Sequence, residues 1–370
     1  MKKKEFCVLG IMSGTSIDGL DFSLIKTDGM KNVKIIKNKY YKFNKKIRDE
    51  ISDLINIFCL EKKFFRNEKY YKIEQNFLNF VVKNISIFLS ELSDGEKKID
   101  LVGFHGNTII HNPKKNISIQ LGDPKILAKT INIPVVANFR NRDIKNLGEG
   151  APLVPIFHKA IFSKTAKNII VINIGGISNF TFLIGKTELI ASDIGPGNTL
   201  IDKFCLMRFN KYFDKNGSIA SKGKVDYSLV NSWMKKNYFK KSLPRSFDTK
   251  NFSLNNFSQN KEISDYNFLR SLTFLSAKLI SELQTKLKKK IDFWVFSGGG
   301  IRNLTLMHEI KNLIGSENIF LSDELGYNSS FIESSAFGYI SVRTLKKLPS
   351  AFPSTTGCKK RNICGEIYYP

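Results

Sequence analysis

The sequence predicts an α/β protein made of two similar lobes, and three observations support this fold class. The chain has 370 residues, which is long enough for two domains of ordinary size. Segments with the alternating pattern of strands are interspersed with segments whose apolar residues recur at helical spacing. A strand, a turn of small polar residues and a returning strand occur at residues 6–25 and again at 168–184. The repeated hairpin predicts a duplicated architecture.

The first half of the chain predicts a hairpin followed by alternating helices and strands. In the hairpin, Leu20, Phe22 and Leu24 alternate with polar residues, as in a half-buried strand. Asp123 and Pro124 form a helix start, with Asp as the N-cap and Pro in the first turn. The other predicted elements are strands at 33–41, 99–105 and 133–139, helices around 47–58 and 73–88, and a polar loop at 140–150.

The second half of the chain begins with the same predicted order of elements, a strand hairpin followed by helices and strands. Residues 168–174 have the continuous apolar pattern of a buried strand, and residues 263–287 place leucines on one face of a long amphipathic helix. The other predicted elements are a helix from Asn198, an irregular stretch at 240–261, a strand at 293–296, and helices from Asn303 and over 331–345. We therefore expect a first lobe of residues 1–137 joined by 341–370, and a second lobe of residues 138–340.

The composition indicates a globular protein of a reducing compartment. Hydrophobic residues make up 42% of the chain and 30 residues are Phe, so sizeable cores can form. No apolar stretch approaches the roughly 20 residues needed to cross a bilayer, and the N-terminal Met-Lys-Lys-Lys run lacks the features of a secretory signal. The five cysteines are scattered and odd in number, which is typical of reduced thiols. We expect a cytoplasmic protein with no membrane partner.

The formal net charge of +25 is the extreme feature of the composition. A basic surface supplies nonspecific affinity for nucleic acids. The lysines, however, are spread over almost every segment, and neither an arginine-rich tract nor a nucleic-acid-binding module accompanies them. We interpret the charge as a compositional bias that also favours anionic small substrates by steering, and we expect no nucleic-acid partner.

Four glycine-containing turns follow predicted strands, at residues 13–19, 175–179, 195–198 and 297–300. Glycines permit close approach and positive φ, and a nest of backbone N–H groups suits phosphate. None of the turns has the sequence of a P-loop or of a dinucleotide-binding motif. Each turn alone is equally consistent with a structural connection. Four in one chain, two of them on paired hairpins, favour a nucleotide site.

Several acidic residues stand beside these turns. Asp193 lies at the end of a strand and before a helix, where a carboxylate is suited to act as a general base on a hydroxyl or a water. The alternative is a turn-forming or helix-starting Asp. Asp18 and Asp21 flank the first turn and are suited to hold the waters of a Mg²⁺ ion, or else are solvated.

His105, His111, Arg140 and Arg142 are the remaining polar candidates. The two histidines are six residues apart on a predicted hairpin, and a metal site would need a third ligand that the sequence does not supply. Hydrogen bonding to a substrate or a structural role fits them better. The arginines suit an anionic substrate through bidentate pairing, with surface salt bridges as the alternative.

Motifs spread in order over nearly the whole chain resemble those of one known family, the anhydro-N-acetylmuramic acid kinases. The motifs are Ile11–Asp21, Gly103–Thr108 with His111, Gln120–Asp123, Gly150–Pro155, Asn173–Asn179, Asp193–Asn198, Ser297–Asn303, Glu333 and Thr355–Gly357. The resemblance implies a two-lobed, actin-like (ribonuclease H-like) sugar-kinase fold with a nucleotide cleft between the lobes. It implies that ATP and water open the 1,6-anhydro bridge of anhydro-N-acetylmuramic acid and that O6 is phosphorylated, in cell-wall sugar recycling. It leaves a homodimer open.

The resemblance also assigns roles to residues, with ATP and Mg²⁺ as cofactors. Asp193 is the base that activates water. The residues assigned to ATP are Ser13, Gly14, Thr15, Ser16, Ile17, Asp18, Gly19, Leu20, Asp21, Asn173, Gly175, Gly176, Gly195, Gly197, Asn198, Gly298, Gly299 and Gly300. The residues assigned to the sugar are His105, Thr108, Arg140 and Glu333, and Asp18 is assigned to Mg²⁺ through a water.

Five positions depart from the family pattern. They are Asn138 in place of Asp, Leu147 in place of Gly, Glu149 in place of Gln, Ile194 in place of Thr, and Ser330 in place of an acidic residue. These departures bear on substrate-side hydrogen bonds rather than on the reaction class. The sequence also leaves two alternatives open, a simple hexose or amino-sugar kinase of the same superfold and a nucleotide-switched binding protein.

Overall fold

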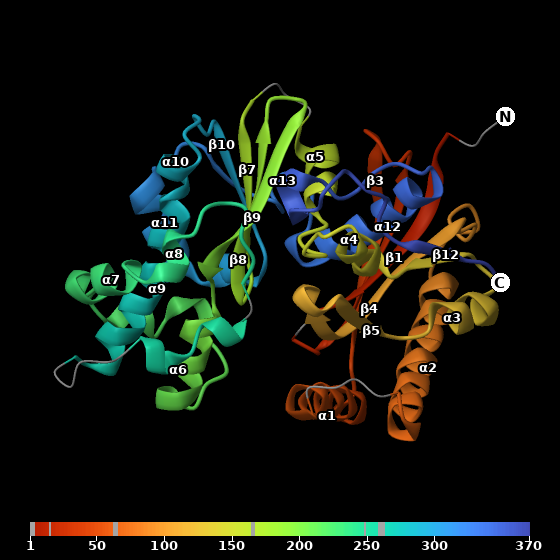
Figure 1. Ribbon diagram of the computed structural model, residues 1–370, viewed down its shortest axis with the longest axis horizontal. Coiled ribbons are helices and arrows are strands. Elements are labelled where there is room, and N and C mark those ends of the chain that lie inside the picture. Colours follow the sequence, from red (N-terminus) through yellow and green to blue (C-terminus); the bar gives the residue numbers. More distant parts are fainter. Residues whose placement is uncertain (1–3, 15, 62–65, 164–166, 248, 258–262) are drawn as a thin grey trace. The chain divides into compact units, whose positions relative to one another are not determined.

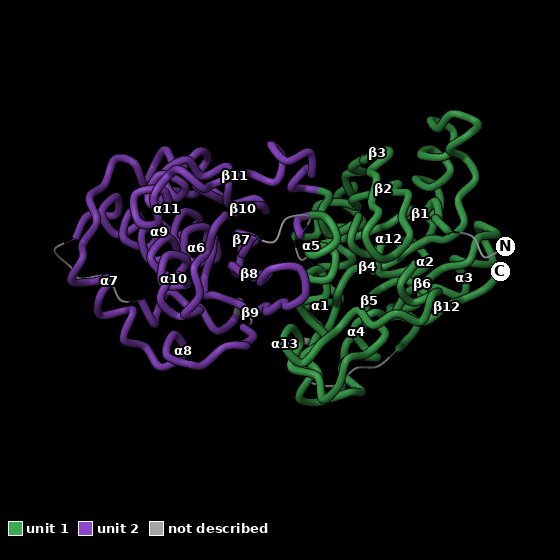
Figure 2. The backbone as a smooth tube through the Cα atoms, turned by 90° about the horizontal axis from the view of Figure 1, so that it is seen from above, with its two compact units in different colours: residues 1–161, 331–370 green, residues 162–330 purple. Residues whose placement is uncertain are grey.

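In the computed structural model, the described residues form two separate mixed β-sheets (Figure 1). The structure describes residues 4–14, 16–61, 66–163, 167–247, 249–257 and 263–370. The chain divides into two units (Figure 2): unit 1 comprises Met1–Ile161 and Phe331–Pro370, and unit 2 comprises Phe162–Ser330.

Unit 1 contains a seven-stranded sheet and the helices packed on it. Its strands are β1 (Phe6–Ser13), β2 (Gly19–Thr27), β3 (Val33–Lys42), β4 (Leu101–Asn112), β5 (Ile117–Leu121), β6 (Val135–Ala137) and β12 (Glu366–Tyr368). Its helices are α1 (Lys45–Glu61), α2 (Glu68–Ser90), α3 (Pro124–Ile131), α4 (Phe139–Lys145), α5 (Pro155–Phe162), α12 (Ile332–Leu345) and α13 (Pro353–Thr356).

Unit 2 contains a five-stranded sheet with its own helices. Its strands are β7 (Ile169–Ile174), β8 (Ile177–Ile184), β9 (Glu188–Pro196), β10 (Phe293–Ser297) and β11 (Ile319–Leu321). Its helices are α6 (Thr199–Phe209), α7 (Tyr227–Met234), α8 (Asn237–Lys240), α9 (Asp265–Ser281), α10 (Leu283–Lys286) and α11 (Leu304–Ile314).

The two sheets share one strand order, which confirms the duplication that the hairpins predicted. In unit 1 the order β3-β2-β1-β4-β6 has an antiparallel β1–β2–β3 meander, with β4 parallel to β1 and β6 parallel to β4. In unit 2 the order β9-β8-β7-β10-β11 has the same antiparallel meander and the same two parallel strands. This is the ribonuclease H-like arrangement, and the predicted α/β fold class is therefore confirmed.

Local sequence explains where the main helices begin and which face they bury. Asn67 caps α2 by accepting a hydrogen bond from the Tyr70 amide, and Asp123 caps α3 with Pro124 in its first turn. One face of α2, made of Ile73, Phe77, Val81, Ile85 and Phe88, is buried in the core of unit 1. In the same way, the apolar face of α9 is buried in a separate core in unit 2. Each unit thus has its own hydrophobic core.

Helix α12 lies against β1, β2 and β4 so closely that glycine is required at the contact. A Cβ built on Gly10 of β1 would lie 1.9 Å from the Ser334 carbonyl oxygen, and one built on Gly103 of β4 would lie 2.5 Å from the Phe337 carbonyl oxygen. Backbone atoms cannot move aside as a side chain can, so these positions tolerate no Cβ without a shift of the helix. The close packing joins α12 to unit 1.

The unit boundaries differ from those the sequence predicted, at 161/162 and 330/331 instead of 137/138 and 340/341. The predicted loop at 140–150 contains helix α4, and a buried carboxylate ties this region to the C-terminal segment. Asp143 accepts hydrogen bonds from the Gly150 amide, the Thr356 hydroxyl and the Asn362 side-chain amide, each at 2.9 Å. Residues distant in the sequence therefore share unit 1.

Two predicted strands also differ in length. The strand predicted to end at His105 continues as β4 to Asn112, because Asn107, Thr108 and Ile110 onwards pair with β5. The strand predicted over 133–139 is shortened to Val135–Ala137, and Phe139 instead begins α4. As a result, the motif at 103–108 lies on a strand rather than in a loop.

Candidate functional site

The turn of the first hairpin is held in place by a side chain of the neighbouring strand. Asn107 of β4 donates from Nδ2 to Ser13 Oγ at 2.9 Å and to the Gly14 carbonyl at 3.0 Å. The Ile17 amide donates back to the Gly14 carbonyl at 3.3 Å, and Ile17 has a φ of 52°. Thr15, which was assigned to ATP, lies outside the described residues. The described residues at the start of the predicted phosphate turn are thus anchored to the neighbouring strand.

Asp18 and Asp21 lie on either side of the start of β2, and together with Glu333 of α12 they form an acidic group. Asp18 is exposed and accepts a hydrogen bond from Ser16 Oγ at 2.8 Å. The pKa of Asp21 is raised to about 7, first by burial and then by the charges of Asp18 and Glu333. The contributions of Asp18 and Glu333 mark a concentration of negative charge, which a divalent cation would neutralise.

These carboxylates suit a Mg²⁺ ion that keeps most of its waters better than a metal ion coordinated entirely by protein side chains. Among the described residues, no group of three or more His, Cys, Asp or Glu side chains is arranged to hold a metal ion. Mg²⁺ in kinases keeps several waters and is bound through one or two carboxylates and the phosphates of its nucleotide. Asp18 and Asp21 meet that requirement.

The raised pKa of Asp21 predicts a pH-dependent stability difference for Asp21→Asn. The folded pKa of about 7 exceeds the ordinary carboxyl value of 3.8, so the stabilisation by the neutral carboxyl is present below pH 4 and is lost as pH rises through 7. The Asn side chain of the variant does not ionise, so the variant does not lose this stabilisation as the pH rises. We expect its free energy of unfolding, relative to wild type, to rise between pH 4 and pH 8 by on the order of 1 kcal/mol in urea titrations with EDTA. A difference that is independent of pH would contradict the assignment.

His105 and Arg140, two of the residues assigned to the sugar, contact each other directly. Arg140 donates from Nε to His105 Nε2 at 3.0 Å and from Nη1 to the Gly150 carbonyl at 2.9 Å. An arginine Nε always carries its hydrogen, so His105 Nε2 accepts, and His105 Nδ1 carries the proton toward the Gly106 carbonyl at 3.0 Å. Burial and the Arg140 charge hold the pKa of His105 well below its usual value. His105 is therefore a neutral ring that orients Arg140.

Glu333 connects the arginine to the acidic group. Its charge opposes the lowering of the Arg140 pKa by burial, and it also raises the pKa of Asp21. Its carboxylate thus acts on both groups. Thr108, the fourth residue assigned to the sugar, accepts a hydrogen bond from Gln120 Nε2 at 3.4 Å. Unit 1 therefore holds Asp18, Asp21, Glu333, Arg140 and His105 close enough to act on one another electrostatically, with a direct hydrogen bond between Arg140 and His105.

The second hairpin is bound to the start of α6 by backbone hydrogen bonds. The amides of Gly197 and Thr199 donate to the Gly176 carbonyl at 2.8 and 3.1 Å, and the Asn198 amide donates to the Gly175 carbonyl at 2.9 Å. A Cβ built on Gly197 would lie 2.4 Å from the Gly175 carbonyl oxygen. Four of the residues assigned to ATP, two from the β7–β8 turn and two from the start of α6, are therefore held side by side in unit 2.

The three glycines after β10 differ in whether the surrounding protein leaves room for a side chain. Gly298 has a φ of 84°, and a Cβ there would lie 2.3 Å from Asn173 Oδ1. At Gly300 a Cβ would lie 2.2 Å from Ile174 Cγ2, whereas at Gly299 it would meet nothing within 4 Å. The protein's own packing thus requires Gly298 and Gly300. Only Gly299 leaves open space next to the backbone, as a ligand would need.

Gly195 has a similar structural explanation. It lies in β9, and a Cβ there would lie 2.9 Å from Leu279 Cδ1 and 3.1 Å from Phe239 Cε1. Its missing side chain therefore makes room for the core of unit 2.

Asp193 is held in place by residues of the segment 240–261, which the sequence predicts to be irregular. The Phe247 amide donates to Asp193 Oδ2 at 2.8 Å, and the Asp193 amide donates to the Arg245 carbonyl at 3.0 Å. The Arg245 guanidinium donates to the Asp193 carbonyl at 3.2 Å and to the Phe239 carbonyl at 2.9 Å. The half-buried carboxylate is thus held in a defined orientation, as a general base requires.

The sequence interpretation missed Asn107, Arg245 and Phe247 as supporting residues. Asn107 lies inside the motif Gly103–Thr108, so the sequence offers a signal for it. In the structure its Oδ1 is buried without a hydrogen-bond partner among the described residues. Arg245 and Phe247 carry no local signal, because their contact with Asp193 spans more than 50 residues.

The structure shows where the five residues that depart from the family pattern lie and what they contact. Asn138 and Leu147 have positive φ angles of 55° and 62°, and Leu147 is 71% exposed. Asn tolerates this region, whereas Leu is strained there, which accounts for the usual Gly. Ile194 is buried in the core, the exposed Glu149 donates from its amide to Thr356, and Ser330 accepts from Arg302 at 3.3 Å.

Comparison with known proteins agrees with the fold and the motifs. The strand order of both units defines an α/β protein of the ribonuclease H-like class. A family model described as anhydro-N-acetylmuramic acid kinase matches residues 6–370. The chain belongs to this family of kinases, and the resemblance seen in the sequence is confirmed. None of the helices in the described part of the chain is long and apolar enough to cross a membrane.

Relatives named anhydro-N-acetylmuramic acid kinase match over nearly their whole length. The protein from Rhodopseudomonas palustris (strain CGA009) is 36% identical over 352 residues, covering 94% of this chain and 95% of the relative. The protein from Bradyrhizobium diazoefficiens is 34% identical over 369 residues, covering 98% and 99%. The protein from Brucella canis is 32% identical over 359 residues, covering 95% of both.

Proposed function

We propose that this protein is an ATP-dependent kinase that opens 1,6-anhydro-N-acetylmuramic acid with water and phosphorylates O6, in cell-wall sugar recycling. The products are N-acetylmuramic acid 6-phosphate and ADP. The observation that carries the proposal is the fixed carboxylate of Asp193, held by the Phe247 amide and the Arg245 segment. Membership of the family over residues 6–370 supports the substrate class.

In the proposed reaction Asp193 takes a proton from water, whose oxygen then attacks the anomeric carbon. The bond from that carbon to O6 breaks, and O6 forms a bond to the γ-phosphorus of ATP while ADP leaves. Inverting glycoside hydrolysis needs a base for water and an acid for the departing oxygen. Here the phosphoryl group captures the departing O6, so the reaction needs no separate acid.

The other residues bind and orient the reactants. Arg140, held by His105 and next to the charge of Glu333, is suited to an anionic or hydroxyl group of the sugar. The backbone N–H groups of the two glycine hairpins are suited to the phosphates of ATP, and Gly299 leaves room for the adenosine. Mg²⁺ bound near Asp18 and Asp21 would supply charge stabilisation for phosphoryl transfer.

Two measurements test the proposal. In a coupled ADP-release assay across anhydro-sugars, N-acetylglucosamine and glucose, we expect turnover with 1,6-anhydro-N-acetylmuramic acid and little with the others. When the reaction runs in ¹⁸O-water, we expect the label on the anomeric carbon, read before mutarotation exchanges it. A simple hexose kinase would release ADP with glucose or N-acetylglucosamine and incorporate no label in its chemical step. That result would overturn the hydrolytic assignment.

A further inference from the structure

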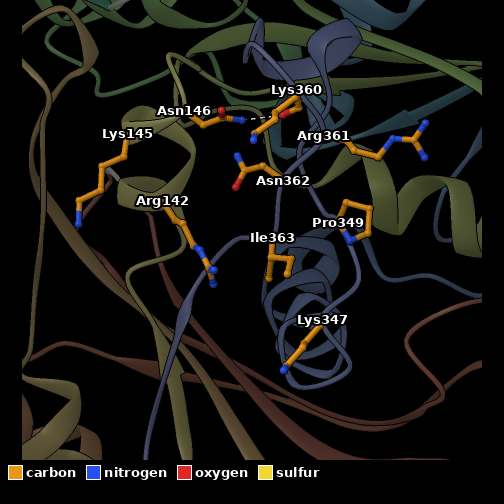
Figure 3. Close-up of a pocket in the computed structure, with 9 residues that line it drawn as sticks. All are labelled: Arg142, Lys145, Asn146, Lys347, Pro349, Lys360, Arg361, Asn362 and Ile363. Carbon is orange, nitrogen blue, oxygen red and sulfur yellow. Dashed lines mark hydrogen bonds between the residues drawn. The ribbon is translucent and has the colours of Figure 1, made fainter.

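A basic pocket in unit 1 is lined by none of the residues that the family resemblance assigns to ATP or to the sugar, although it includes Arg142, which the sequence marked as suited to an anion. Its volume is about 480 Å³, and three segments form its walls (Figure 3): the end of α4, the turn after α12 and the C-terminal segment. The lining residues are Arg142, Lys145, Asn146, Lys347, Pro349, Lys360, Arg361, Asn362 and Ile363.

The charge of this pocket is entirely positive. Five of its nine lining residues are Lys or Arg and none is acidic. None of these five side chains forms a salt bridge with a carboxylate in the described ranges, whereas Lys37 and Lys39 elsewhere in unit 1 both pair with Glu91. Five like charges around one cavity repel one another, so an anion bound there relieves the repulsion.

The walls of the basic pocket are held together before any ligand binds. Asn146 donates from Nδ2 to the Lys360 carbonyl at 2.6 Å, and the Lys359 amide donates back to the Asn146 carbonyl at 3.0 Å. Beneath them, Asn362 donates to the buried carboxylate of Asp143, and Arg343 donates from Nε to the Pro349 carbonyl at 3.0 Å. A ligand therefore loses little affinity to the ordering of loops.

The side chains do not contribute equally. Figure 3 shows the Lys360 side chain directed toward Asn146 and Asn362, while Arg361 extends away from them. Within the described ranges, the Arg142 guanidinium makes one long hydrogen bond, of 3.4 Å to the Gly365 carbonyl, so it retains donors for a ligand. A guanidinium and an ammonium around one cavity form the donor set that binds phosphate groups.

We propose that the basic pocket binds a small organic phosphate or diphosphate carrying at least two negative charges, through residues that are assigned neither to ATP, nor to the sugar, nor to catalysis. The volume of about 480 Å³ suits one small molecule. A nucleic-acid strand or a membrane surface would instead need a row of cations that continues beyond the pocket. The proposal does not depend on the kinase reaction, because it concerns other residues and is tested by binding alone.

The test is a calorimetric titration with inorganic pyrophosphate at about 50 mM salt. A saturating non-hydrolysable ATP analogue occupies the nucleotide site throughout. We expect one pyrophosphate per chain for the wild type. For the double variant Lys347→Gln/Lys360→Gln we expect binding to weaken at least about tenfold, because two charge-assisted hydrogen bonds are lost. Wild-type affinity should also fall as salt rises.

The control variant is Lys114→Gln/Lys129→Gln, which removes two exposed lysines of unit 1 outside the pocket. It changes the net charge equally and should bind pyrophosphate as the wild type does. Equal weakening in both variants, or no binding to the wild type, would overturn the proposal. So would pocket-dependent binding of single-stranded RNA or anionic vesicles in the absence of pyrophosphate binding. Unchanged melting temperatures exclude unfolding as the cause.

Discussion

Replacement of Asp193 by Asn is expected to lower kcat by about 10²–10⁴-fold while the affinity for ATP stays near normal. The amide cannot take the proton of the attacking water. It is nearly isosteric with the carboxylate, and its oxygen can still accept the hydrogen bond from the Phe247 amide. The measurement combines steady-state ADP release with equilibrium binding of a non-hydrolysable ATP analogue.

A matched control for this variant is Asp202→Asn in α6 of the same unit. Asp202 is half-buried, burial and the charge of Asp214 raise its pKa to about 7, and it has no assigned role in the reaction. Its substitution should leave kcat within about twofold, as most substitutions away from a site do. If Asp193→Asn retains more than about a few per cent of the wild-type rate, Asp193 is not the general base.

Replacement of Gly10 by Ala is expected to cost about 3 kcal/mol or more of unfolding free energy. The added Cβ would lie 1.9 Å from the Ser334 carbonyl oxygen and 2.8 Å from the Gly338 amide nitrogen, and both atoms belong to the backbone of α12. Helix and strand would have to separate, and the packing between them would be lost. Urea denaturation followed by circular dichroism measures the effect.

Gly95→Ala is the control for that substitution. A Cβ built on Gly95 has nothing within 4 Å, and its φ lies outside the positive range that alanine avoids. We expect a change within about 0.5 kcal/mol. If Gly10→Ala unfolds at the same urea concentration as Gly95→Ala, α12 does not lie on β1 as the structure has it.

The parts of the fold that the sequence predicted correctly depend on local pattern. The hairpins over 6–25 and 168–184 are visible because alternation and turn chemistry are encoded by neighbouring residues. The helix starts at Asp123 and Asn303 were visible because a cap is a local signal. The polar stretch at 140–150 was not recognised as the helix α4, since charged residues hide a short amphipathic pattern.

What the sequence could not predict comes from contacts between distant segments. The unit boundaries follow from the packing of α12 on β1 and from the hydrogen bonds of Asp143, which span 213 and 219 residues. The support of Asp193 by Arg245 is equally non-local. The glycine triplet was recognised as a candidate, but only coordinates distinguish the open Gly299 from Gly298 and Gly300, which the chain's own packing requires.

The placement of α12 has a consequence for synthesis on the ribosome. Unit 2 is one continuous segment, so it can fold as soon as it has emerged. Unit 1 begins the chain, yet the helix that covers Gly10 and Gly103 is made after the whole of unit 2. Although domains generally fold in the order in which they are made, the nascent N-terminal sheet stays uncovered on that face until residues 332–345 appear. During that interval the uncovered face is open to aggregation, as transiently exposed apolar surface generally is.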